Sequence, residues 1–155
     1  MASVSNSSPL IALAHIGQLE LLGRVFGSVL IPPSVAEETA FTIPIRPAWI
    51  EIRKPVKNVP SEHLRSGLGR GERDALALAL DVQPDRLIID ELLARRIATA
   101  LNLPVTGTLG VLVSAKEKGL IESVRVHLDR LVDVGFFIGP DLYKQLLISV
   151  GEAKG

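Results

Sequence analysis

The chain has 155 residues, of which 47% are hydrophobic and 22% are charged, a composition typical of a globular protein with a buried core. Its 17 basic and 17 acidic residues give a formal net charge of zero, which excludes nucleic-acid binding by bulk charge but not by a local patch. Cysteine is absent, so disulfides and thiolate metal sites are excluded.

Helical periodicity and short β-branched runs alternate along the chain. Helices are predicted at residues 10–16, 18–26, 71–80, 92–98, 109–118, 122–134 and 140–150, with others starting at Ser34 and at Ser61. Buried strands are predicted at residues 28–31, at 87–89 and near Val105, and a further strand at 49–52. The predicted fold class is therefore α/β, with a mostly parallel sheet covered by helices on both faces.

No repeat or linker divides the sequence, so we expect one domain over residues 1–150 and a tail at 151–155 that frays. Residues 54–60 form a basic, proline-containing loop, and residues 54–71 are the least ordered internal segment by composition. No apolar run reaches the roughly 18 residues of a membrane span, and no signal-peptide pattern begins the chain. We therefore expect a cytoplasmic protein with no membrane partner.

Carboxylates flank the central stretch at residues 71–98. Glu72 and Asp74 begin its first helix, and Asp90 and Glu91 follow its strand. Ligands bind α/β sheets outside the carboxyl ends of the strands, and carboxylates placed there suit Mg²⁺ or Mn²⁺. The alternative is structural: acids stabilise helix N-termini through the macrodipole, and Asp90 could be an N-cap.

Other polar residues occupy equivalent positions along the chain. Asn6 follows the segment at Val4, which is too short to predict from periodicity and is taken as a first strand. Glu38 lies in the helix after the strand at 28–31, and Thr106 and Thr108 follow the strand near Val105. Several carboxylates meeting at one edge would repel each other without a cation, so their joint presence favours metal binding.

Five segments in this order carry a resemblance to a known family: residues 5–11, 31–38, 71–79, 88–91 with Arg95 and Ala98, and 106–110. Over residues 4–147 the chain resembles the PIN domains, metal-dependent ribonucleases that include the VapC-like toxins of toxin–antitoxin pairs. It looks closest to an uncharacterised prokaryotic PIN-like subfamily. The resemblance implies a three-layer α/β/α sandwich with an acidic pocket at the carboxyl edge of the sheet.

The resemblance also implies roles for individual residues. The implied catalytic positions are Asn6, Glu38, Glu72 and Asp90; the implied Mg²⁺ or Mn²⁺ ligands are Glu72, Asp90, Glu91 and Asn6. Glu37, Asp74 and Glu91 are alternatives to Glu38, Glu72 and Asp90. Asn6 departs from the family, which has an aspartate there; it could ligate through its neutral carbonyl oxygen or serve only as an N-cap.

The expected function is that of a metal-dependent ribonuclease toxin, acting on RNA, held silent by a small antitoxin and forming a homodimer. The expected nucleic-acid contacts are Arg70, Arg73, Arg95, Thr106 and Thr108. The alternative is a catalytically impaired PIN-like module that binds a partner or nucleic acid without cleaving it. A nucleotide-binding α/β domain is disfavoured, because neither a GxGxxG fingerprint nor a P-loop is present.

Overall fold

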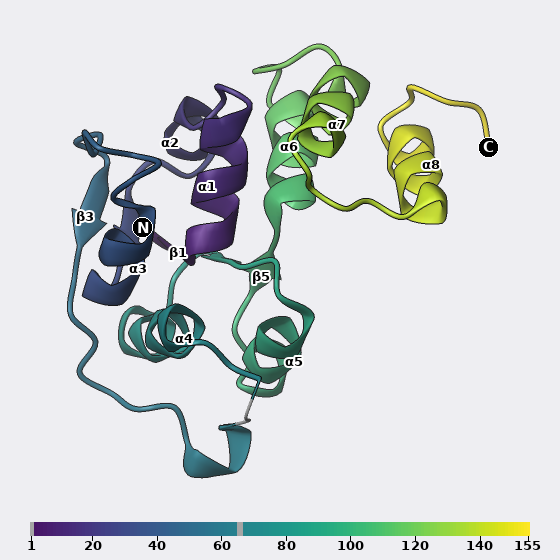
Figure 1. Cartoon of the computed structure of the whole chain (residues 1–155). Helices are drawn as coiled ribbons and strands as arrows, with labels where there is room; N and C mark the ends of the chain where they lie inside the picture. The colour runs from purple at the N-terminus through teal and green to yellow at the C-terminus, as the bar shows by residue number, and fades with distance from the viewer. Residues whose placement is uncertain (1, 65–66) are drawn as a thin grey trace.

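The computed structural model describes residues 2–64 and 67–155 and contains a five-stranded sheet at its centre (Figure 1). The strand order is β3-β2-β1-β4-β5, and every neighbouring pair is parallel. The strands are β1 (Ser3–Ser5), β2 (Val29–Ile31), β3 (Ile50–Ile52), β4 (Leu87–Ile88) and β5 (Val105–Thr106). The predicted α/β class is confirmed, including the strand at residues 49–52.

Helices connect the strands, as parallel pairing requires. They are α1 (Ser7–His15), α2 (Glu20–Phe26), α3 (Pro33–Thr39), α4 (Arg70–Val82), α5 (Leu92–Ala100), α6 (Thr108–Glu117), α7 (Val124–Asp133) and α8 (Pro140–Ser149). The helix expected to start at Ser61 is a single 3₁₀ turn, η1 (Ser61–His63), because the backbone is already extended at Leu64.

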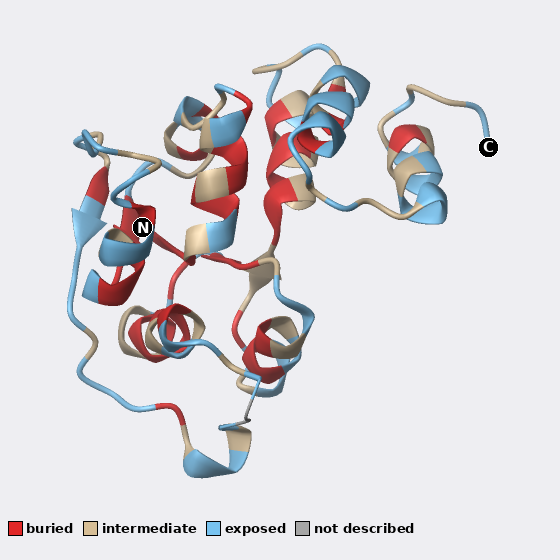
Figure 2. Cartoon of the chain, in the orientation of Figure 1, coloured by how far each residue is buried: buried red, intermediate tan, exposed pale blue. Residues whose placement is uncertain are grey.

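Two apolar cores lie on opposite faces of the sheet, and alternate strand residues are divided between them. Val29, Ile31 and Ile88 join the core formed with α1, α2, α6 and α7, whereas Leu30 and Leu87 join the core formed with α4 and α5. Figure 1 shows these two groups of helices on either side of the strands, and Figure 2 shows the burial of the helix faces that meet the sheet. The fold is thus a three-layer α/β/α sandwich. None of the helices in the described ranges is long and apolar enough to cross a membrane.

The basic loop after β3 is attached to α4. Asp81 accepts hydrogen bonds from the backbone N–H groups of Val56 (2.6 Å) and Lys57 (2.8 Å), and Val59 is buried in the core formed with α4 and α5. This loop begins the segment that we predicted to be least ordered, of which residues 65–66 lie outside the described residues.

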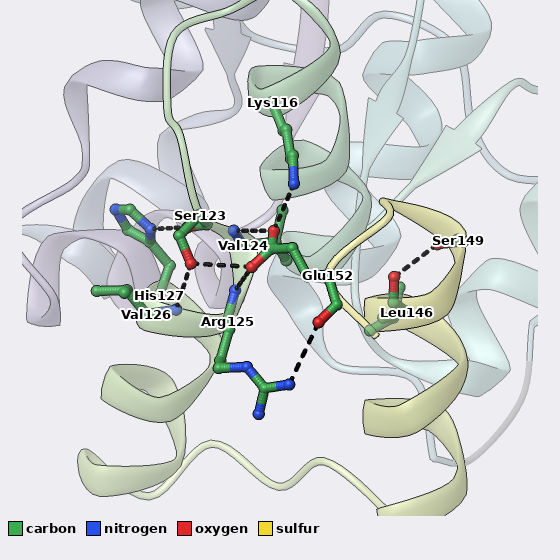
Figure 3. Close-up of polar contacts among 9 residues, drawn as sticks. All are labelled: Lys116, Ser123, Val124, Arg125, Val126, His127, Leu146, Ser149 and Glu152. Atoms are coloured by element: carbon green, nitrogen blue, oxygen red, sulfur yellow. Dashed lines mark hydrogen bonds and ion pairs between the residues drawn. The ribbon is translucent and has the colours of Figure 1, made fainter. Parts of the chain in front are cut away.

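The C-terminal residues contact the start of α7 through Glu152 (Figure 3). Its carboxylate accepts hydrogen bonds from Lys116 Nζ (2.8 Å), Ser123 Oγ (2.9 Å), Val124 N (2.6 Å) and Arg125 N (3.0 Å). Burial alone would raise the pKa of Glu152, but these hydrogen bonds outweigh the desolvation and lower the pKa to about 2. Glu152 belongs to the tail for which the sequence predicted fraying, and we propose that it secures this tail to α7.

Candidate functional site

A cavity of about 520 Å³ lies beside the carboxyl end of β1, where predicted site residues from three elements meet. Asn6 follows β1, Glu38 is in the last turn of α3, and Glu72 is in the first turn of α4. The cavity continues along one face of α1 and ends at the turn after α7. Its lining residues are Asn6, Ser7, Ser8, Ile11, Ala12, His15, Glu38, Gly69, Gly71, Glu72, Val134, Gly135 and Phe136.

Asn6 is the most deeply buried polar residue of this cavity, with 5% of its surface exposed. It occupies the N-cap position of α1, but its side chain makes no capping hydrogen bond. Within residues 2–64 and 67–155, no hydrogen-bond partner reaches its side-chain oxygen Oδ1. A buried carbonyl oxygen left without a donor is unfavourable by about 1–3 kcal/mol, so a bound cation would satisfy a real deficit here. Of the two roles left open for Asn6, this geometry favours ligation over capping.

Glu38 owes its position to a glycine and a serine. Ser7 Oγ donates a short hydrogen bond to Glu38 Oε1. A Cβ atom at Gly71 would lie 3.0 Å from Glu38 Cδ, so a larger residue there would displace the carboxylate. Gly71 therefore allows the last turn of α3 and the first turn of α4 to approach closely enough to share the cavity.

Glu72 and Asp74 point to different sides of α4. Glu72 lines the cavity, and its Oε1 accepts a hydrogen bond from Gly69 N at 2.7 Å, which caps the helix. Asp74 accepts a hydrogen bond from Ser34 Oγ at 2.6 Å and lines a separate cleft. The structure thus places Glu72, not its alternative, beside Asn6, and Glu72 also has the helix-capping role that we considered for such acids.

Asp90 and Glu91 are likewise separated by the structure. Asp90 accepts hydrogen bonds from Thr108 N (2.7 Å) and Thr108 Oγ1 (2.6 Å) and a longer one from Ser8 Oγ (3.4 Å). Asp90 itself lines a different cleft and is linked to the cavity only through Ser8, which lines it. Glu91 is the N-cap of α5, where its side chain accepts a hydrogen bond from Leu93 N at 2.8 Å. The N-cap role considered for Asp90 therefore belongs to Glu91, which the structure places away from the cavity.

The five expected nucleic-acid contacts do not form one surface. Arg70 and Arg73 line the cleft beside Asp74, whereas Arg95 and Thr106 line another cleft that includes Asp90. Thr108 is fully buried, and both its N–H and its hydroxyl are used by Asp90.

Arg95 is held close to the strand ends by another glycine. Arg95 Nη1 donates a hydrogen bond to the carbonyl of Ile89 at 3.2 Å. A Cβ atom at Gly107 would lie 2.6 Å from Arg95 Nη1 and 2.7 Å from Asp90 Oδ1. Gly107 thus leaves room for both side chains between β4 and β5.

The donor chemistry of the cavity fits a hard divalent cation. Carboxylate oxygens from Glu38 and Glu72 and the unpartnered Asn6 oxygen are the ligand types that Mg²⁺ and Mn²⁺ prefer. Among the described residues, however, no three His, Cys, Asp or Glu side chains are grouped closely enough to hold a metal. The carboxylates of Glu38, Glu72 and Asp90 instead accept hydrogen bonds from Ser7, Gly69 and Thr108, respectively. A cation at this cavity would therefore need the Asn6 oxygen as well as the carboxylates.

Several neighbours of these acids were not predicted from the sequence. Ser7, Ser8 and His15 are not among the predicted site residues, yet all three line the cavity. The Ser7 hydroxyl could have been noticed, because it adjoins Asn6 in the same motif. Phe136 had no usable signal, since it comes from a loop 130 residues away from Asn6.

The fold and the site together define an α/β/α protein with an oxygen-lined cavity at the carboxyl edge of a parallel sheet. A family model described as a PIN domain matches residues 2–152. The chain therefore belongs to the PIN-domain family and has a nuclease-type fold. Searches of curated proteins and of solved structures found no match.

Proposed function

We propose that this protein is a metal-dependent ribonuclease of the VapC-like type. The observation that carries the proposal is the buried Asn6 oxygen, which has no partner within the described residues and borders the cavity shared by Glu38 and Glu72. A site built only to stabilise the fold would pair this oxygen with a donor. The membership of a nuclease-type family makes a divalent cation the fitting partner.

In this proposal, Asn6, Glu72 and Asp90 would hold Mg²⁺ or Mn²⁺. The bound ion supplies positive charge for the scissile phosphate and lowers the pKa of a coordinated water. Glu38, oriented by the Ser7 hydroxyl, would accept a proton from the attacking water as the water oxygen bonds to phosphorus and the P–O bond to the leaving oxygen breaks, and would return that proton to the leaving oxygen. Thr108 keeps Asp90 in place through its two hydrogen bonds.

We further propose that the protein acts in the cytoplasm as the toxin of a toxin–antitoxin pair, that residues 1–150 form its one domain, and that it works as a homodimer. Exposed apolar side chains support the presence of partners, among them Phe41 (97% exposed) and Phe137 (87% exposed). A short upstream open reading frame that encodes a small DNA-binding protein would support the pairing. Its product should abolish RNA cleavage when mixed with this chain.

A second candidate is a binding module that has lost cleavage. Asn6 favours it, because an amide supplies no negative charge where the family has an aspartate, and a weaker cation site follows. Calorimetric titration with Mn²⁺ separates the two candidates. Binding below the millimolar range supports the nuclease, and absence of binding at millimolar Mn²⁺ supports the module.

The proposed reaction is tested by cleavage of a labelled single-stranded RNA with Mg²⁺, with Mn²⁺ and with EDTA. Glu38→Gln should reduce the cleavage rate roughly 100- to 10,000-fold, as expected for loss of a general base. Asn6→Asp should lower the Mn²⁺ concentration needed for half-maximal rate. Glu117→Gln, which changes an exposed carboxylate on α6, is the control and should leave the rate unchanged. Equal rates for the wild type, Glu38→Gln and Asp90→Asn would refute the proposal.

A further inference from the structure

A second cleft, of about 490 Å³, lies on the opposite side of the first turn of α4 from the acidic cavity. Among the described residues, four cationic side chains line it: Lys54 and Lys57 from the loop after β3, and Arg70 and Arg73 from α4. Asp74 is the one acid among the lining residues that the structure describes, and its carboxylate accepts a hydrogen bond from the Ser34 hydroxyl. The cleft is therefore a local region of positive charge on a chain whose formal net charge is zero.

The walls of this cleft are held by specific contacts. Asp81 accepts the two backbone hydrogen bonds at Val56 and Lys57, and Lys57 Nζ donates to the carbonyl of Leu80 at 3.4 Å. Val59, only 5% exposed, packs into the core beneath α4. The loop thus runs alongside α4 and keeps its lysines opposite the arginines of the helix.

The cations of the cleft are largely free to meet a ligand. Arg70 is paired with Glu37, but at 3.7 Å and with both side chains more than two-thirds exposed this ion pair is weak. Lys54 and Arg73 are exposed, and neither side chain has a hydrogen-bond or ion-pair partner among the described residues. A polyanion would therefore displace little to bind here.

Helix α4 lies between this cleft and the acidic cavity. At 100° per residue, Arg70 and Arg73 share one face of the first turn, and Gly71 and Glu72 share the other. Helix α3 borders both spaces as well, with Ser34 in the cleft and Glu38 in the cavity. A chain lying in the cleft is thus separated from the acids by the diameter of α4, about 10 Å.

We propose that the cleft between the loop at residues 54–59 and helices α3 and α4 binds the phosphate backbone of single-stranded RNA and leads it to the acidic cavity. This inference rests on the proposed function, which it deepens by giving the substrate a path. The contacts are to phosphates and carry no sequence preference. Bases are not stacked there, because none of the described residues that line the cleft is aromatic.

The test measures binding of a fluorescent single-stranded RNA oligonucleotide to the full-length protein by anisotropy, in EDTA, so that no cleavage occurs. The triple variant Lys54→Gln, Lys57→Gln, Arg73→Gln removes three positive charges from the cleft. The matched control, Lys118→Gln, Lys144→Gln, Lys154→Gln, removes three exposed positive charges elsewhere. Urea unfolding verifies that both variants are folded as well as the wild type.

We expect the cleft variant to bind RNA at least about tenfold more weakly and its salt dependence, log K against log salt, to flatten by about 2, since each phosphate contact to a single strand contributes about 0.7. The control variant should change neither quantity. Equal weakening by both variants would overturn the inference, as would a poly-glutamate peptide that binds the cleft as tightly as RNA does. Because binding is measured without cleavage, RNA that binds through the cleft but is never cut would refute the proposed function alone.

Discussion

The carboxylate of Glu152 offers the most direct test of how the C-terminal residues contribute to stability. Its side chain is 13% exposed and meets Lys116 in an ion pair at 2.8 Å. The first backbone N–H groups of α7, which have no partner within the helix, donate to it as they would to a helix cap. Glu152→Gln keeps the shape of the side chain but removes its charge. The perturbation therefore isolates the electrostatic part of this contact.

The size of the effect follows from the pKa. Lowering the pKa of Glu152 from 4.5 to about 2 corresponds to about 3 kcal/mol of stabilisation of the folded state at neutral pH. Because the folded-state pKa is the lower one, this stabilisation is present above the unfolded pKa of 4.5 and is lost as the pH falls towards 2. We expect Glu152→Gln to lose about 2–3 kcal/mol at pH 7 and to converge with the wild type in acid.

Urea unfolding at a series of pH values measures this difference, with Glu117→Gln as a control of equal charge change. The control should stay within about 0.5 kcal/mol of the wild type at every pH. A Glu152→Gln variant as stable as the wild type at pH 7, or a deficit that does not shrink between pH 4.5 and about 2, would refute the reasoning.

Three further predictions concern single contacts. Thr108→Val should cost about 1–3 kcal/mol in urea unfolding, because it removes the hydroxyl bonded to Asp90; an unchanged midpoint would contradict this. Gly71→Ala should slow RNA cleavage, because its Cβ displaces the carboxylate of Glu38; unchanged cleavage would argue against the role of Glu38. The hydrogen bond to Asp129 raises the pKa of Tyr143, the one tyrosine, above 10, and ultraviolet titration of Asp129→Asn should return it towards 10; identical titrations would remove the hydrogen bond from consideration.

The order of elements in this fold is strongly encoded in local sequence. Short apolar runs such as residues 29–31 and 87–89 are buried on both faces, which only a parallel sheet between helices provides. Glycine and proline mark most helix ends, so the predicted boundaries of α4, α5 and α8 agree with the structure within a few residues. The 3₁₀ turn at residues 61–63 was misread because a good helix start does not ensure that the chain continues as a helix.

The site was less predictable, because it depends on the directions of neighbouring side chains. Successive residues at the end of a strand point to opposite sides, so a change of one position exchanges Asp90 and Glu91, and the sequence left both open. Which of Glu72 and Asp74 faces the cavity depends on the rotation of α4 against α3. Long-range partners such as Thr108 for Asp90 follow only once the sheet order is known.

The strand order also constrains when the cavity can exist during synthesis on the ribosome. β1 pairs with β2 and with β4, so its second neighbour emerges more than 80 residues after it. The carboxylate of Asp90 gains its two hydrogen bonds from Thr108 only after that residue, the first of α6, has been synthesised. Until α6 has emerged from the ribosome, a nascent chain therefore has Asn6 and Glu38 but no Asp90 carboxylate held by Thr108. Any cleaving activity must then appear late in translation.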